Sequence, residues 1–151
     1  MKKVAISACL LGKACRYDAK HNLDDALLAH LDKVELVPFC PEDDAFGTPR
    51  PTMDLVNTSK GVRALSNATG EDLSSPVQDY AKNFFNTHPD ISLFIGKDRS
   101  PSCGVCSAKM YDEHKQLLST QETGLMAKVA QERNIICVDA ETYVEQNGET
   151  L

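Results

Sequence analysis

The sequence predicts an α/β fold with three layers, in which a mainly parallel sheet is covered by helices on both faces. Short apolar runs typical of strands alternate along the chain with segments whose apolar residues recur at helical spacing. In addition, Cys9, Cys40 and Cys103 each follow one of the strand patterns. Loops at the carboxyl ends of parallel strands share one edge, where ligands usually bind, so we expect the three thiols to gather there.

Four apolar runs are short enough to be strands, and several of them are rich in β-branched residues. They cover Val4–Ile6, Val34–Phe39, Ile91–Ile95 and Asn134–Val138. The third run is entered from the turn signal Pro89-Asp90 and is closed by Gly96. A further pattern over Met53–Leu65, with Gly61 inside it, predicts a short hairpin.

Three segments between these runs predict helices. In Asn22–Leu31, leucines recur at helical spacing, and Asn22 with Asp25 three residues later is typical of an N-terminal cap. A second helix is expected to begin at Ser74 or Ser75, with Pro76 in its first turn, and to extend through Phe85. The third is expected to follow Thr123-Gly124, because Leu125, Met126, Val129 and Ala130 again share one face.

Length and composition are those of one compact domain spanning 1–151. No apolar stretch approaches the roughly 20 residues that span a bilayer, and the run after Met-Lys-Lys is too short for a signal peptide. We therefore expect a cytoplasmic protein with no membrane contact. A net charge of −6, from 16 basic and 22 acidic residues, argues against nucleic acid as the main partner.

Six cysteines in a cytoplasmic chain indicate metal binding or redox chemistry rather than disulfides. A structural zinc site needs four ligands, commonly from two C-x-x-C pairs, and the spacing supplies only one such pair, Cys103 with Cys106. An iron–sulfur cluster suits widely separated cysteines better, because each thiolate binds a different iron. With three protein ligands, a four-iron cluster keeps one open iron, a Lewis acid that accepts a substrate's sulfur.

Three pairs of motifs follow one another along the chain. SACLLG (Ser7–Gly12) precedes CRYD (Cys15–Asp18), CPE (Cys40–Glu42) precedes GTPRP (Gly47–Pro51), and SPSCG (Ser100–Gly104) precedes Tyr111-Asp112. In this combination and order, the chain resembles the TudS-type thiouracil desulfidase family. The resemblance runs from Ser7 to about Asp112.

This resemblance implies a small Rossmann-like domain that binds a [4Fe-4S] cluster through three cysteines and leaves one iron open. It also implies removal of sulfur from 2- or 4-thiouracil, giving uracil and sulfide without net redox change. Carried over by motif, Cys9, Cys40 and Cys103 are the cluster ligands, Glu42 is the acid/base, and Ser100 lies beside the substrate. The expected partners are a small thiolated pyrimidine and the cluster-assembly machinery.

General chemistry is consistent with these roles. Binding of the substrate's sulfur to an open iron makes the adjacent carbon more electrophilic, and water then attacks that carbon. Glu42, two residues after Cys40, is placed to take the proton of this water, provided that burial raises its pKa. Ser102 is expected to bind the substrate or orient the water. Arg50, stiffened between two prolines, either contacts the substrate or holds the acidic loop.

The remaining cysteines leave alternatives open. Cys15, six residues after Cys9, is either a fourth ligand or, as its loop position favours, a nearby accessory thiol. Cys106 completes a C-x-x-C with Cys103, a pattern typical of thiol redox proteins, although here it follows a proline-containing loop late in the chain. A non-catalytic iron–sulfur or zinc-binding protein is the other alternative. Cys137 lies in an apolar strand pattern and is expected to pack in the core.

Overall fold

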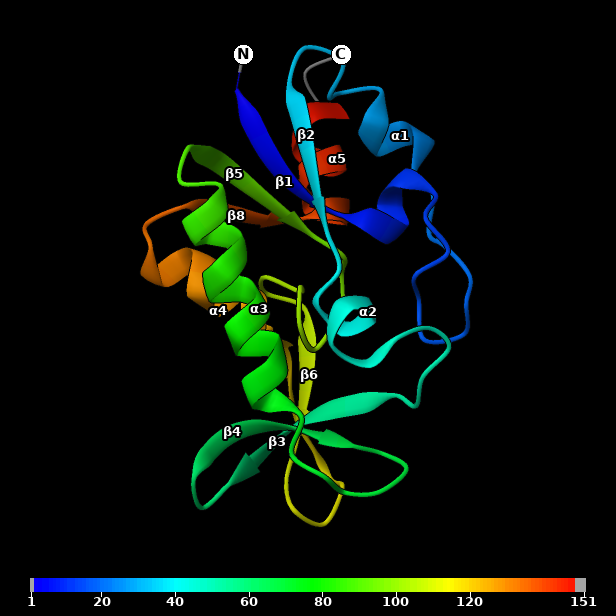
Figure 1. Ribbon diagram of the computed structural model, residues 1–151, viewed down its shortest axis with the longest axis vertical. Coiled ribbons are helices and arrows are strands. Elements are labelled where there is room, and N and C mark those ends of the chain that lie inside the picture. Colours follow the sequence, from blue (N-terminus) through cyan, green and yellow to red (C-terminus); the bar gives the residue numbers. More distant parts are fainter. Residues whose placement is uncertain (1, 149–151) are drawn as a thin grey trace.

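The computed structural model describes residues 2–148 and folds them around two four-stranded sheets (Figure 1). The first sheet has the order β2-β1-β5-β8, and all of its strands are parallel. It comprises β1 (Lys3–Ser7), β2 (Glu35–Phe39), β5 (Ile91–Gly96) and β8 (Ile136–Asp139). All four strands predicted as single runs are therefore present, and the parallel sheet is confirmed.

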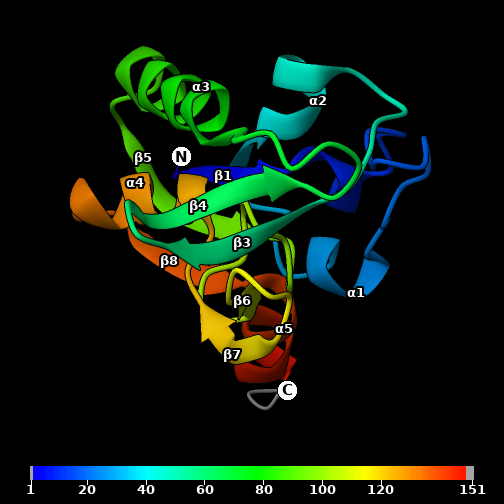
Figure 2. The same ribbon diagram turned by 90° about the horizontal axis from the view of Figure 1, so that it is seen from below.

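Helices cover both faces of this sheet. On one face, Phe39 and Phe94 pack against α3 (Ser74–Thr87) and α4 (Leu125–Glu132). On the other, Val4 and Ile6 pack with residues of α1 (Asp25–Leu28) and α5 (Ala140–Gly148). Figure 2 shows α3 and α5 on opposite sides of the strands. The three-layer arrangement predicted from the sequence is thus confirmed. Within residues 2–148, no helix is long and apolar enough to cross a membrane.

The second sheet has the order β4-β3-β6-β7 and mixes parallel and antiparallel pairs. It comprises β3 (Met53–Thr58), β4 (Gly61–Ser66), β6 (Ala108–Tyr111) and β7 (Leu117–Glu122). Its buried residues pack against Val77 of α3 and Leu125 of α4. The predicted hairpin is confirmed as β3 and β4. The sequence did not predict β6 and β7, because β6 is only four residues long and most of β7 is exposed.

One predicted helix start is wrong. The first helix is confined to Asp25–Leu28 and is capped by Asp24, whose carboxylate accepts from the Leu27 amide at 3.0 Å, so Asn22 is not the cap. The Asn22 side chain donates instead to the Cys9 sulfur, so tertiary hydrogen bonding overrides the local capping pattern there. The second helix begins at Ser74 as predicted, with Leu73 as its N-cap, and the Ser74 hydroxyl accepts from the Ala64 amide of β4 at 2.8 Å. The helix after Gly124 is confirmed as α4.

The fourth predicted strand is an edge strand rather than a buried one. Ile136 in β8 is 71% exposed, because β8 pairs only with β5.

Two short elements at the ends of parallel strands were not predicted. They are the 3-10 turn η1 (Ala8–Leu11) after β1 and the helix α2 (Pro41–Phe46) after β2.

Two glycines let the loop of residues 100–104 approach the rest of the fold closely. A Cβ on Gly96, at the end of β5, would lie 1.7 Å from the carbonyl oxygen of Cys103. A Cβ on Gly124, before α4, would lie 2.5 Å from the carbonyl carbon of Ser102. The Gly124 amide also donates to the Gly104 carbonyl at 2.7 Å. The loop that carries Cys103 is therefore clamped between β5 and α4 by backbone contact.

We predict that Gly96→Ala destabilises the fold by about 3 kcal/mol or more, because the added methyl group meets main chain that has no room to move. The measurement is the free energy of unfolding in urea. Gly70→Ala is the control, because an added Cβ there meets open space and only the positive φ of 75° opposes the change. This variant should lose only about 1–2 kcal/mol. Equal losses would contradict the clamping role of Gly96.

Candidate functional site

The strand ends of the first sheet open into a cavity of about 610 Å³. Four of the six cysteines line it, namely Cys9, Cys15, Cys40 and Cys103. This volume lies within the range of about 300–1,000 Å³ that is usual for small-molecule sites. The structure therefore gathers the three cysteines at the predicted edge and adds Cys15 to them. Their roles as ligands stay a prediction.

Cys9 and Cys40 are held by short elements that begin where strands end. Cys9 lies in η1, half-buried, and its sulfur accepts from the Asn22 amide group at 3.6 Å. Cys40 is the N-cap residue of α2, and its backbone amide donates to the Tyr80 hydroxyl of α3 at 3.2 Å. The Cys40 thiol donates to the carbonyl of Cys15 at 3.7 Å. The main chain is held at both positions, since the Cys9 carbonyl also accepts from the Asn22 amide at 2.9 Å.

The loop that carries Cys103 is held by a serine and an aspartate. The Ser100 hydroxyl accepts from the backbone amides of Ser102 at 3.2 Å and Cys103 at 3.0 Å. Asp139, at the end of β8, accepts from the amides of Val105 at 2.7 Å and Cys106 at 2.8 Å. It also accepts from the Ser107 hydroxyl at 2.9 Å. Sequence reasoning missed Asp139, although a polar residue directly after a predicted strand was the available signal.

Burial raises the pKa of three of the cavity thiols, those of Cys9, Cys15 and Cys103. It raises the pKa of Cys103 well above its usual value and that of Cys9 above its usual value. For Cys15, burial and the neighbouring Cys40 raise the pKa to about 12. Several adjacent thiolates need a cation to offset their mutual repulsion, and a coordinating thiol is deprotonated outright when a metal binds it.

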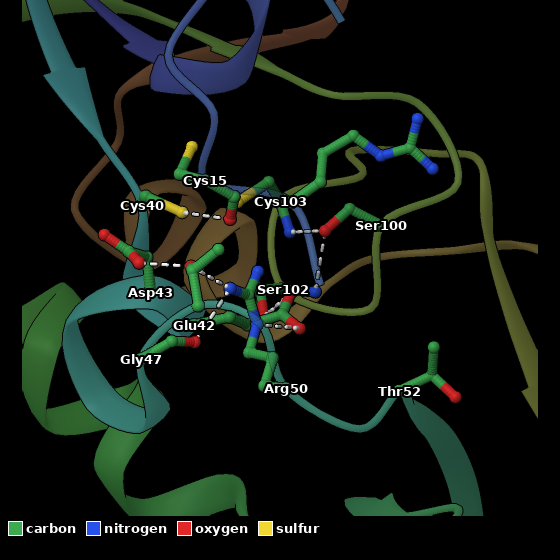
Figure 3. A network of polar contacts seen from close by, with 12 residues as sticks. Cys15, Cys40, Glu42, Asp43, Gly47, Arg50, Thr52, Ser100, Ser102 and Cys103 are labelled. Carbon is green, nitrogen blue, oxygen red and sulfur yellow. Dashed lines mark hydrogen bonds and ion pairs between the residues drawn. The ribbon is translucent and has the colours of Figure 1, made fainter. Parts of the chain in front are cut away.

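Glu42 is a buried carboxylate in the same cavity. It lies in the first turn of α2, and the Ser102 hydroxyl donates to its Oε2 at 3.0 Å (Figure 3). Burial raises the pKa of Glu42, whereas Arg50 and the hydrogen bond from Ser102 act in the opposite direction. Arg50 Nε lies 3.9 Å from Glu42 Oε1. Glu42 is thus not a solvated surface carboxylate, because its side chain is only 17% exposed.

Arg50 holds the loop after α2 and also lines the cavity. Its Nη1 donates to the Gly47 carbonyl at 3.1 Å and to the Thr48 hydroxyl at 2.8 Å. The Thr48 hydroxyl in turn donates to Asp43. From the sequence, Arg50 was predicted either to contact the substrate or to hold the acidic loop. Its hydrogen bonds show that it holds the loop, and its place in the cavity lining also allows contact with a ligand.

Other predicted site residues lie in different surroundings. Ser100 lines the cavity, whereas Ser102 is fully buried and reaches the site only through Glu42. Cys106 is exposed and its thiol points to the Gln121 carbonyl at 3.9 Å, outside the cavity lining. Cys137 packs against the core cluster that contains Phe39 and Phe94, as predicted.

The second sheet supplies a wall of the cavity that the sequence did not predict. Thr52, Asp54 and Asn67 line it, and the Asn67 side-chain amide donates to the Thr52 hydroxyl at 2.9 Å. Local patterns carry no signal for this contribution, since it depends on how the two sheets are placed in space. The cavity lining therefore combines thiols with polar side chains, and Glu42 and Arg50 also belong to it.

The residues present fit an iron–sulfur cluster. Within residues 2–148, no three His, Cys, Asp or Glu side chains are placed to hold a single metal ion. The four thiols instead line a cavity of about 610 Å³. Soft thiolate donors spread around a volume suit a group in which sulfide bridges connect several irons.

A parallel sheet covered on both faces, with thiols and a buried carboxylate at its strand ends, defines the chain as an α/β protein with a cysteine-lined cavity. The 2-thiouracil desulfurase family matches residues 4–142, and the chain belongs to this family. The resemblance inferred from the motifs is therefore confirmed.

Two individual proteins are also similar to this chain. "Uncharacterized protein YbbK" of Bacillus subtilis (strain 168) is 29% identical over 109 residues, which cover 67% of this chain and 72% of that protein. A solved structure described as "[4Fe-4S]-dependent thiouracil desulfidase TudS" matches with a TM-score of 0.73 and 24% identity over 100% of both chains. The second similarity confirms the fold.

We predict that Asp139→Asn destabilises the protein by about 1–3 kcal/mol. The backbone amides of Val105 and Cys106 each donate to one carboxylate oxygen of Asp139, and the variant places an NH2 donor opposite one of these amides. Urea unfolding measures the loss. Asp79→Asn on the exposed side of α3 makes the same change in charge and should leave stability within about 0.5 kcal/mol. Similar effects in both variants would show that the charge, not the hydrogen bonds, matters.

Proposed function

We propose that this protein removes sulfur from thiouracil, releasing uracil and sulfide, with a [4Fe-4S] cluster bound by Cys9, Cys40 and Cys103. The observation that carries the proposal is the presence of these three thiols and the buried carboxylate of Glu42 in one cavity. Membership of the 2-thiouracil desulfurase family supports it. So does the likeness to a solved protein described as a [4Fe-4S]-dependent thiouracil desulfidase.

The cysteines have the role of holding the cluster at the strand ends. When bound, the cluster supplies an iron Lewis acid for the soft sulfur of the substrate. Cys9, Cys40 and Cys103 come from three different loops, and each loop is fixed by hydrogen bonds of its own main chain or side chains. Cys15 is an accessory thiol in this proposal.

Glu42 moves the protons. Its carboxylate accepts a proton from the water that attacks the thiocarbonyl carbon, and it later returns a proton to the ring nitrogen or to the departing sulfur. Thiouracil and water then give uracil and hydrogen sulfide, so atoms balance and no electron is transferred. Burial favours this role, because a raised pKa brings a carboxyl group closer to the range in which it both accepts and donates protons.

Two serines support this chemistry from different positions. Ser102 donates to Glu42 and orients its carboxylate, while the carboxylate's other oxygen remains available to water. The Ser100 hydroxyl accepts from the Ser102 and Cys103 amides and so fixes the loop, and Ser100 lines the cavity beside the substrate. The proposal further includes a small thiolated pyrimidine as substrate, delivery of the cluster by assembly proteins, and a cytoplasmic location.

We predict that anaerobic reconstitution with iron and sulfide gives about four irons per chain and activity on 2- or 4-thiouracil. Replacing Cys9, Cys40 or Cys103 by Ser should abolish both cluster formation and the release of uracil and sulfide. Iron content and absorbance measure the first effect, and chromatography of uracil measures the second.

The matched controls are Cys106→Ser and Cys137→Ser, because both thiols lie outside the cavity lining. Both variants should keep their iron and activity. Loss of function in the Cys106 variant with the cluster intact would favour a thiol redox protein. Failure of the wild-type chain to take up iron would overturn the proposal.

A separate prediction concerns Glu42. Glu42→Gln keeps the shape of the side chain but removes its ability to take a proton, so kcat should fall by about 10²–10⁴-fold. The cluster should remain, since Glu42 is not proposed as a ligand. Steady-state kinetics and iron analysis on the same sample test this. Unchanged turnover with an intact cluster would exclude Glu42 as the acid/base.

A further inference from the structure

One buried donor in the cavity has no hydrogen-bond partner. Within residues 2–148, Arg50 Nε is a fully buried side-chain nitrogen without such a partner, and the Arg50 side chain is only 6% exposed. An unsatisfied buried donor of a charged group is strongly unfavourable, so native structures normally provide an acceptor for it. Because Arg50 lines the cavity, a ligand in the cavity is able to supply this acceptor.

The position of Arg50 is fixed from the other side of its guanidinium group. Nη1 binds the Gly47 carbonyl and the Thr48 hydroxyl, so the group does not turn freely (Figure 3). Glu42 is fixed in its turn by the hydrogen bond from Ser102. The distance of 3.9 Å between Arg50 Nε and Glu42 Oε1 is too long for a hydrogen bond. Arg50 and Glu42 therefore form an ion pair without a hydrogen bond between Nε and the carboxylate.

This pair of groups matches one edge of the substrate. A donor beside an acceptor is complementary to a ring amide, in which a carbonyl oxygen accepts and the adjacent N–H donates. In thiouracil, the ring N3–H lies between a thiocarbonyl and a carbonyl group. Cys103, Glu42 and Arg50 all line the same cavity, and Arg50 Nε lies 3.9 Å from Glu42 Oε1.

We propose that Arg50 Nε donates to the ring carbonyl that is separated from the thiocarbonyl by N3–H, and that Arg50 is thereby a specificity-determining residue. The inference rests on the proposed function. It identifies the substrate class as cyclic thioimides, in which sulfur and oxygen flank one ring N–H. Rings that carry the thioamide alone lack the acceptor and leave the buried donor unsatisfied.

The test compares two substrates in the cluster-loaded enzyme. Pyrimidine-4(3H)-thione keeps the thiocarbonyl beside N3–H but lacks the C2 carbonyl of 4-thiouracil and, with it, the hydrogen on N1. The kcat/KM ratio of 4-thiouracil to pyrimidine-4(3H)-thione is measured in the wild type, Arg50→Lys and Arg50→Met. Taking the ratio within each variant removes general effects on folding or cluster content. The wild-type preference should fall by about 10- to 100-fold in both variants, the range expected for one hydrogen bond to a charged group.

Thr48→Val is the matched control. It removes one hydrogen bond to Arg50 Nη1 and loosens the same loop, but it keeps Nε. Its substrate preference should stay within about threefold of the wild type. If Arg50→Lys, Arg50→Met and Thr48→Val all lower the two kcat/KM values by one common factor, Arg50 only holds the loop and the inference is wrong.

Binding of uracil provides a readout that does not depend on turnover. Calorimetry on the cluster-loaded protein should show a dissociation constant that rises by about 10- to 100-fold in Arg50→Lys and that is little changed in Thr48→Val. Uracil binding that depends on Arg50 in a protein without desulfidase activity would support the contact and overturn the proposed reaction. Desulfidase activity with unchanged uracil binding and substrate preference would overturn the contact alone.

Discussion

Parallel pairing of β1 with both β2 and β5 is the constraint on which the site depends. Ser7 at the end of β1 is in register with Phe39 of β2, and Ile6 is in register with Ile95 of β5. Because the three strands end at nearly the same level, the segments that follow them emerge at one edge. A shift of one residue in either register would turn the side chains to the opposite face of the sheet. The cysteine-lined cavity is therefore a consequence of strand register and not of any one loop.

Polar and charged side chains are buried around the cavity, and most of their polar atoms have hydrogen-bond or ion-pair partners. Burial of a carboxylate or a guanidinium group is costly unless hydrogen bonds and an opposite charge offset it. Ser102 and Arg50 offset the burial of Glu42, and Asp139 satisfies the amides of the Cys103 loop. Arg50 Nε is the exception among the described residues. An unpaired group at such a position is more informative about a ligand than any of the paired ones.

The sequence predicted what local patterns and chain order control. Apolar runs identified the four strands of the first sheet, and the positions of Cys9, Cys40 and Cys103 relative to them predicted a common edge. Contacts between distant segments were beyond such patterns. The wall from the second sheet and the bonds from Asp139 arise only when strands far apart in the chain are brought together. Asn22 failed as a cap for the same reason, because its side chain approaches Cys9 instead.

The two sheets divide the work of the site. Cys9, Cys40 and Cys103 follow strands of the first sheet, whereas Thr52 and Asp54 line the cavity from the beginning of β3 in the second sheet. The segment between β2 and β3 connects the two sheets and carries Cys40, Glu42 and Arg50. Its geometry is set by the hydrogen bonds of Arg50 to Gly47 and Thr48. Since one segment carries Cys40, the buried carboxylate of Glu42 and the buried donor of Arg50, the proposed function makes cluster binding, proton transfer and substrate selection depend together on its geometry.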